Sequence, residues 1–116
     1  MDHTAAVNED LNIKVGTGAT VSNGRDSYPY YVSEVLPNGV IGLYSADWRF
    51  DDTHPWEGGS GVVGKFDPSK TSEMYLKRRY GNWWNCSKEG KPINKYTGKY
   101  TRLRFNGAYA YQDPSF

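Results

Sequence analysis

Short runs in which apolar or aromatic side chains alternate with polar ones recur along the chain, and turn dipeptides separate them. These runs occupy residues 19–23, 28–36, 40–48, 72–80, 82–87, 99–105 and 108–113, with a shorter run at 61–66. Alternation that is rich in Val, Thr, Tyr and Trp is typical of half-buried strands. Apolar residues nowhere recur at helical spacing over three turns, so the pattern predicts almost no helix.

The turn dipeptides predict how the strands are joined. Asn23-Gly24, Asn38-Gly39 and Asn106-Gly107 suit type I′ hairpins, in which both central residues take a positive φ. Tyr80-Gly81-Asn82 marks a further turn, and the last hairpin is expected to pair 99–105 with 108–113. The predicted fold is all-β, a small twisted SH3-like barrel of about seven short antiparallel strands.

Length and pattern together indicate one domain. A chain of 116 residues suits a single core. Residues 12–116 hold all of the strand-like runs and are predicted to form a single all-β domain. Residues 1–11 lack such a run and are predicted to be a disordered N-terminal arm.

Charge is divided unevenly between the two halves, although the net charge is only +1. Residues 1–61 hold three Lys or Arg and nine Asp or Glu, a balance of −6, whereas residues 62–116 hold eleven and four, a balance of +7. Such asymmetry is typical of a basic region that meets an anionic partner. It is also expected where the halves attract each other within one domain or between copies.

The single cysteine and the absence of apolar runs bear on the compartment. Cys86 has no partner for a disulfide within the chain and is interpreted as a buried structural thiol. No apolar run approaches 18 residues, and residues 1–12 lack the apolar segment of a signal peptide. We therefore expect a soluble, cytoplasmic protein that does not enter a membrane.

The stretch YLKRRYGNWWNC, residues 75–86, combines three consecutive cations with two consecutive tryptophans. Two hairpin registers are open, with the loop at Tyr80-Gly81 or at Gly81-Asn82, and both place a cation opposite a tryptophan. Opposed side chains of this kind stabilise a hairpin, contributing about 0.2–1 kcal/mol per pair. A self-stabilising hairpin is therefore one interpretation, and a binding surface is the other.

The binding interpretation depends on which side chains share a face. Trp83 and Trp84 are adjacent, so in a strand one enters the core and the other is exposed or covered by arginine. If the last two hairpins are neighbours, their cations and rings form one basic-aromatic surface. The residues predicted to bind a partner there are Lys77, Arg78, Arg79, Trp83, Trp84, Arg102, Arg104, Tyr109 and Tyr111.

A long glycine-rich loop, RFDDTHPWEGGSG at residues 49–61, offers a second patch. Trp56 and His54 are the candidate contacts, because loops carry binding residues and tryptophan is a frequent interface anchor. Asp51, Asp52 and Glu57 add carboxylates to the imidazole, but the spacing matches no established metal motif. We predict no metal, no cofactor and no catalytic residue.

The stretch VGTGATVSNGRDSYPYYVSEVLPNGVIGLY resembles the G-x-GAT start, and the strands that follow it, of a family of short uncharacterised phage and bacterial proteins. KFDPSKTSEMYLKRRYGNWW is similar to its DPNG turn and FRLRKNGRW hairpin, and AYAYQDPSF to its YYDPSF tail. The resemblance covers roughly residues 14–116 and implies a phage-type accessory protein. It carries no functional residue over to this chain.

The sequence therefore predicts a non-enzymatic intracellular accessory protein that binds a macromolecule through a basic-aromatic β surface. The expected partner is a protein, and inhibition of a host defence enzyme is one role of that kind. Direct DNA or RNA binding by the same surface is the alternative. A metal-dependent hydrolase built on Asp51, Asp52 and His54 and a glycan-binding module are weaker hypotheses. The oligomeric state is left open.

Overall fold

The computed structural model describes residues 13–22, 26–50, 61–93, 101–105 and 107–111 of the chain. Within them it has no helix and eight strands: β1 (Gly18–Ser22), β2 (Ser27–Val35), β3 (Val40–Ser45), β4 (Trp48–Phe50), β5 (Gly61–Val63), β6 (Met74–Arg79), β7 (Asn82–Cys86) and β8 (Arg102–Arg104). In this part of the chain no helix has the length and apolar character to cross a membrane. The predicted arm at 1–11 lies outside the described residues.

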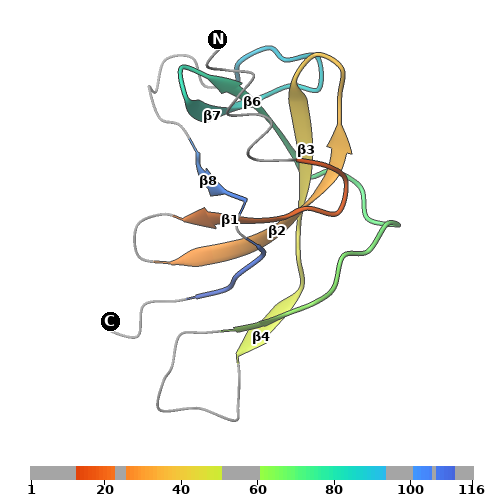
Figure 1. Ribbon diagram of the computed structural model, residues 1–116, viewed down its shortest axis with the longest axis vertical. Helices are drawn as coiled ribbons and strands as arrows, with labels where there is room; N and C mark the ends of the chain where they lie inside the picture. Colours follow the sequence, from red (N-terminus) through yellow and green to blue (C-terminus); the bar gives the residue numbers. More distant parts are fainter. Residues whose placement is uncertain (1–12, 23–25, 51–60, 94–100, 106, 112–116) are drawn as a thin grey trace.

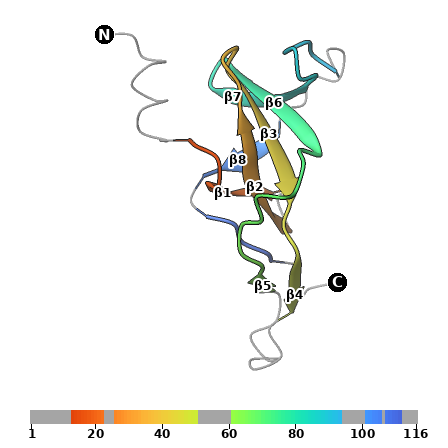
Figure 2. The same ribbon diagram turned by 90° about the vertical axis from the view of Figure 1, so that its right-hand side faces the viewer.

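Six strands form one antiparallel sheet in the order β7-β6-β3-β2-β1-β8 (Figure 1). The two end strands, β7 and β8, approach each other. The N–H of Thr101, which directly precedes β8, donates to the carbonyl of Trp83 in β7 at 2.8 Å. The sheet is therefore a nearly closed barrel, and the prediction of a small all-β barrel is confirmed. β4 and β5 pair in a separate two-stranded sheet at one end (Figure 2).

The core fills the concave side of the six-stranded sheet. Alternate residues of its strands point inward, as the period of two requires. The buried cluster consists of Ala19, Val32, Ile41, Leu43, Leu76 and Trp83. Partly buried side chains that pack against it are Ile13, Tyr30, Met74, Leu103 and Phe105.

The β6–β7 hairpin has the first of the two predicted registers. Lys77 lies opposite Trp84 and Arg78 opposite Trp83. The two loop residues are Tyr80, with φ 54°, and Gly81, with φ 79°. Two successive positive φ values identify a type I′ turn, whose twist matches that of the strands that it joins.

The Asn38-Gly39 turn differs from the prediction, since only Gly39 has a positive φ, 86°. The Gly39 N–H donates to the Leu36 carbonyl at 3.1 Å, and the Leu36 N–H donates to the Val40 carbonyl at 2.8 Å. Pro37 explains the difference. Its fixed φ suits the second residue of a type I turn, and it lacks the N–H that would pair with Val40 if Asn38 and Gly39 formed a two-residue loop. The loop therefore has three residues, and glycine takes the last position.

The predicted last hairpin is wrong. β8 pairs with β1, in a register that places Arg104 opposite Thr20 and Arg102 opposite Ser22. The described residues after it, 107–111, join the sheet at a single bridge between Tyr111 and Ser27. Without β8, the N–H and C=O groups along the edge of β1 would be unpaired. A hairpin between β8 and the residues that follow it would leave that edge open, whereas pairing with β1 fills it.

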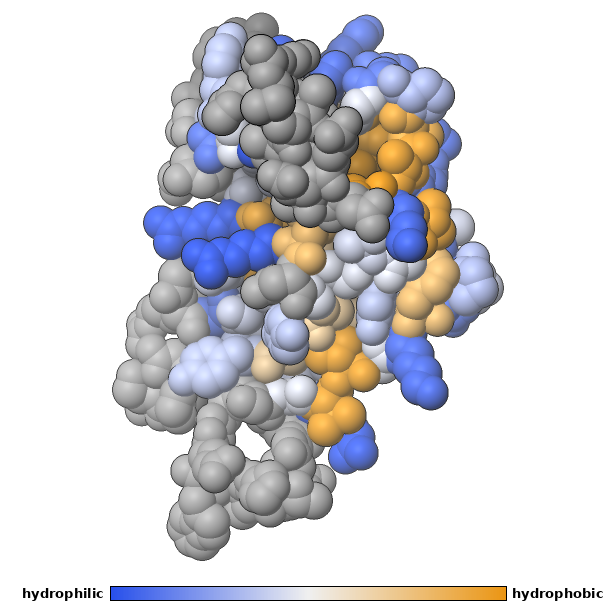
Figure 3. Space-filling model, viewed as in Figure 1, coloured by the Kyte–Doolittle hydropathy of each residue, from blue (hydrophilic) through white to orange (hydrophobic). Residues whose placement is uncertain are grey.

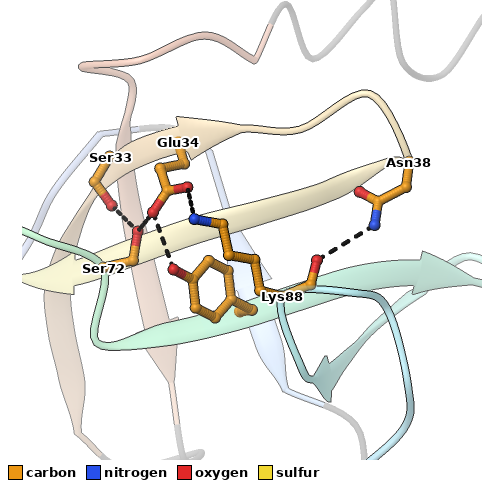
Figure 4. A network of polar contacts seen from close by, with 6 residues as sticks. Ser33, Glu34, Asn38, Ser72 and Lys88 are labelled. Atoms are coloured by element: carbon orange, nitrogen blue, oxygen red, sulfur yellow. Dashed lines mark hydrogen bonds and ion pairs between the residues drawn. The ribbon is translucent and has the colours of Figure 1, made fainter.

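A β-bulge in β2 gives the outer face of the sheet a polar cluster. The register against β3 shifts between Val32 and Glu34, so the Glu34 carboxylate points away from the core. It accepts hydrogen bonds from the hydroxyls of Ser72 at 2.8 Å and Tyr75 at 3.0 Å, and Lys88 Nζ lies 3.3 Å away (Figure 4). These contacts attach two loop segments to the outer face of the sheet.

This cluster predicts a pH dependence of stability. The hydrogen bond from Ser72, helped by Tyr75 and Lys88, lowers the pKa of Glu34 below its ordinary 4.5. A lowered folded-state pKa adds stability above the unfolded value and loses it as pH falls through the folded value. E34Q should therefore lower the free energy of unfolding by up to about 1 kcal/mol at pH 7, since the pair is exposed to solvent, and by nearly nothing near pH ~2. Urea unfolding at both pH values measures this, and an equal loss at both would contradict it; E89Q is the control.

Gly42 in β3 is expected to tolerate no side chain. A Cβ at this buried position would clash with Ser72 Oγ and would lie 2.9 Å from Ser72 Cβ and 3.1 Å from the Tyr75 ring. Overpacking of this kind costs about 1–3 kcal/mol. Gly42→Ala should lower the free energy of unfolding by that amount in urea titrations, and Ser72→Gly in the same chain should restore part of it. A Gly42→Ala protein as stable as the wild type would show that Ser72 does not pack there.

Three aromatic rings hold the segment before β6 on the outer face. Tyr31, Tyr44 and Phe66 have centroids 5.8–6.1 Å apart. The Tyr31 hydroxyl donates to the Gly64 carbonyl, and the Tyr44 hydroxyl accepts from the Asp67 N–H, both at 2.7 Å. In Figure 1 this green segment runs on the side of the barrel away from β8.

Candidate binding groove

A groove of about 570 Å³ lies along the line where β7 and β8 meet. The two strands share one bridge, Trp83 to Thr101, and leave space beside it. Hydroxyl and amide groups line much of the groove, from Thr20, Ser22, Ser27, Asn82 and Thr101. Arg102, Arg104, Tyr109 and an edge of Trp83 complete the polar and aromatic part of the lining. We call this the β7–β8 groove.

The alternation of β8 aims both arginines outward. Leu103 lies opposite Val21 and is partly buried, whereas Arg102 and Arg104 are exposed. Figure 3 shows hydrophilic side chains projecting at the edge where β8 lies in Figure 1. Within the described residues neither arginine takes part in an ion pair. Both guanidinium groups are exposed in the part of the chain that the structure describes.

Thr20 holds Tyr109 beside these arginines. The buried Thr20 hydroxyl donates to the Gly107 carbonyl at 2.7 Å and accepts from the Tyr109 N–H at 3.1 Å. Gly18 allows the close approach, because a Cβ there would lie 2.7 Å from the Ala108 nitrogen. The Tyr109 side chain stays 57% exposed. The groove thus has a fixed backbone and an exposed aromatic ring.

Trp83 is mainly a core residue and only borders the binding surface to which the sequence-based prediction assigns it. Its side chain is 8% exposed and meets the Phe105 ring edge-on, with centroids 5.5 Å apart. Trp84 lies on the opposite face of the hairpin and is only partly buried, and its Nε1–H donates to the Arg79 carbonyl at 3.1 Å. Since adjacent residues in a strand point to opposite sides, only one of the two indoles enters the core.

The prediction of a single basic-aromatic surface is wrong. Lys77 and Arg79 share the outer face of the hairpin with Trp84, whereas Arg78 lies opposite Trp83 on the core-facing side. Arg78 Nη1 is buried and has no hydrogen-bond partner. Three consecutive cations cannot share one face of a strand, because its side chains alternate. The predicted residues therefore divide between this hairpin face and the β7–β8 groove.

The remaining predicted residues lie apart from both surfaces or outside the described chain. Tyr111 is 40% exposed and bridges Ser27, but it does not line the groove. His54 and Trp56, with the neighbouring carboxylates of residues 51–57, lie outside the described residues. Among the residues described, no three His, Cys, Asp or Glu side chains gather as metal ligands.

Sequence reasoning missed the hydroxyl groups that line the groove. Thr20 and Ser22 follow the period of two on β1, and this spacing is the only local signal that they share a face. Their place beside Arg102 and Arg104 follows from the pairing of β1 with β8, which lie some 80 residues apart in sequence. Nothing in either run of residues specifies that pairing.

A second hollow, of about 460 Å³, lies beside Cys86 and is lined by Glu73, Lys88 and Ile93 among others. It contains one acid and one base and none of the predicted binding residues. Cys86 is buried, which confirms the prediction of a buried cysteine, and its burial raises the pKa of the thiol. This hollow is the weaker candidate site.

Comparison of the chain with protein-family models, with curated proteins and with solved structures gives no match. The resemblance to phage and bacterial proteins therefore stays a prediction. The evidence that bears on function is the chemistry of the β7–β8 groove.

Proposed function

We propose that this is a non-enzymatic binding protein that docks on a negatively charged part of a macromolecular partner through the β7–β8 groove. The observation that carries the proposal is the pair of exposed guanidinium groups, Arg102 and Arg104, beside the exposed Tyr109 ring. Charged hydrogen bonds from arginine to carboxylate or phosphate are among the strongest that a surface makes. No carboxylate is among the described residues that line the groove.

The setting that we propose is the cytoplasm, as an accessory protein of the phage type that the sequence resembles. A partner protein with an acidic surface suits the groove, and an enzyme of host defence is one such partner. Inhibition of that kind needs a binding surface and no chemistry of its own. Support comes from the small fold and from the basic half of the chain, whose charge balance is +7.

Direct nucleic-acid binding is the second candidate. The groove offers hydroxyl, amide and guanidinium donors, and the cores of protein–protein interfaces are depleted of charge. Phosphate groups accept hydrogen bonds from all of these donors. This chemistry favours a phosphate-bearing partner.

Affinity capture from expressing cells tests the proposal. The whole chain and its Arg102→Glu, Arg104→Glu variant are used as baits side by side. A macromolecule that the wild type retains and the variant loses supports binding through the groove. Equal retention by both baits would place the binding surface elsewhere.

A further inference from the structure

Tyr80 occupies a position for which folding favours other residues. It is the first loop residue of the β6–β7 hairpin, its φ is 54°, and its side chain is 95% exposed. Among the described residues it is the only one other than glycine with a positive φ. Asparagine, aspartate and glycine are the residues that suit this position of a type I′ turn. A bulky ring here is unfavourable to the backbone and contributes no burial.

Tyr80 directly precedes two residues that line the β7–β8 groove. Gly81 and Asn82, the residues that follow Tyr80, line the groove together with Arg102 and Arg104. A Cβ placed on Gly81 would meet nothing within 4 Å, so the space around the hairpin tip is open. An exposed aromatic ring is therefore carried by the hairpin tip that borders the groove of Arg102 and Arg104.

We infer that the ligand of the groove is single-stranded nucleic acid and that Tyr80 is its base-stacking residue. This inference rests on the proposed function and names the partner class. Phosphates of the strand would meet Arg102 and Arg104, and a base would stack on the Tyr80 ring. Such a combination of cations and exposed rings is how sequence-tolerant single-strand binders work.

The two rival ligands leave part of this arrangement unused. A duplex keeps its bases stacked inside, so it offers phosphates to the arginines and no base face to Tyr80. The carboxylates of an acidic peptide would pair with the arginines but would not stack on the Tyr80 ring. A base that stacks on this ring accounts for a fully exposed tyrosine at a position where the backbone favours other residues.

Fluorescence anisotropy with a labelled oligothymidine of about 20 nucleotides tests this inference, since one small barrel covers roughly 4–16 nucleotides. Tyr80→Asn should weaken binding between about 5-fold and about 150-fold, the effect of one lost base stack. The same substitution should leave the melting temperature unchanged or higher, because asparagine suits the turn. Tyr80→Phe keeps the ring and should bind like the wild type.

Four results would overturn the inference. The first two are unchanged affinity in Tyr80→Asn and an equal loss of affinity in Tyr80→Asn and Tyr80→Phe. The other two are wild-type affinity for a duplex of the same length that equals the affinity for the single strand, and absence of oligothymidine binding. The capture experiment separates failure of this inference from failure of the proposed function. If oligothymidine does not bind but the Arg102→Glu, Arg104→Glu bait loses a protein that the wild type captures, the groove binds a protein and only the nucleic-acid inference fails. If that bait retains everything that the wild type captures, the inference and the proposed function both fail.

Discussion

Replacing Trp83 with alanine is expected to lower the free energy of unfolding by about 3–5 kcal/mol, the usual cost of removing a buried tryptophan. Its indole is 8% exposed, belongs to the main core cluster and packs edge-on against Phe105. A domain of ordinary stability has only about 5–15 kcal/mol in total. Urea unfolding, monitored by circular dichroism, should have its midpoint at a much lower urea concentration than in the wild type.

Trp84→Ala is the matched control for this change. The two side chains are the same and adjacent, but Trp84 lies on the outer face, where its Nε1–H bonds to the Arg79 carbonyl. Loss of one hydrogen bond and of partial burial should cost about 1 kcal/mol. Equal costs for the two substitutions, or a larger cost for Trp84, would contradict the register and the core described above.

Reversing the charge of both groove arginines, Arg102→Glu with Arg104→Glu, should weaken binding of the captured partner about 100-fold or more. Hydrogen bonds to charged groups contribute about 1.5–3 kcal/mol each, and the reversal also adds repulsion. Both side chains are exposed and point away from the core. The fold should therefore keep its melting temperature while titrations of the partner show the loss.

Lys65→Glu with Lys70→Glu is the matched control for that variant. Both lysines are exposed, neither lines the groove, and the change in net charge is the same. Their segment runs on the side of the barrel away from β8 (Figure 1). Affinity should stay within a few-fold of the wild type. A loss as large as that of the arginine variant would mean that net charge, and not the groove, controls binding.

Local patterns sufficed to predict the parts of this fold that form between neighbours in sequence. Alternation predicts seven of the eight strands of the described residues, whereas β4 extends into the stretch predicted to be a loop. The β6–β7 hairpin has its loop at Tyr80-Gly81, the first of the two registers that the sequence allows. These features depend on side-chain period and backbone dihedral preference, which a few residues determine. The all-β barrel follows from the same patterns repeated along the chain.

The candidate site depends on a pairing that no local pattern contains. Asn106-Gly107 suggested a hairpin after β8, but β8 completes the edge of β1 instead. That non-local ladder brings Thr20 beside Arg104 and, through the Thr20 hydroxyl, fixes Tyr109 nearby. The prediction that Arg78 and Arg79 share one surface is wrong for a local reason, because adjacent side chains of a strand point to opposite faces.

The footprint of the captured partner on the backbone amides, measured by hydrogen exchange, tests the groove most directly. Binding in the β7–β8 groove should slow exchange at residues 81–83, 101–104 and 107–109 and leave β5 and residues 64–70 unchanged. Protection confined to β4 and β5, or to the outer face around Glu34 and Ser72, would contradict a binding site at the meeting of β7 and β8.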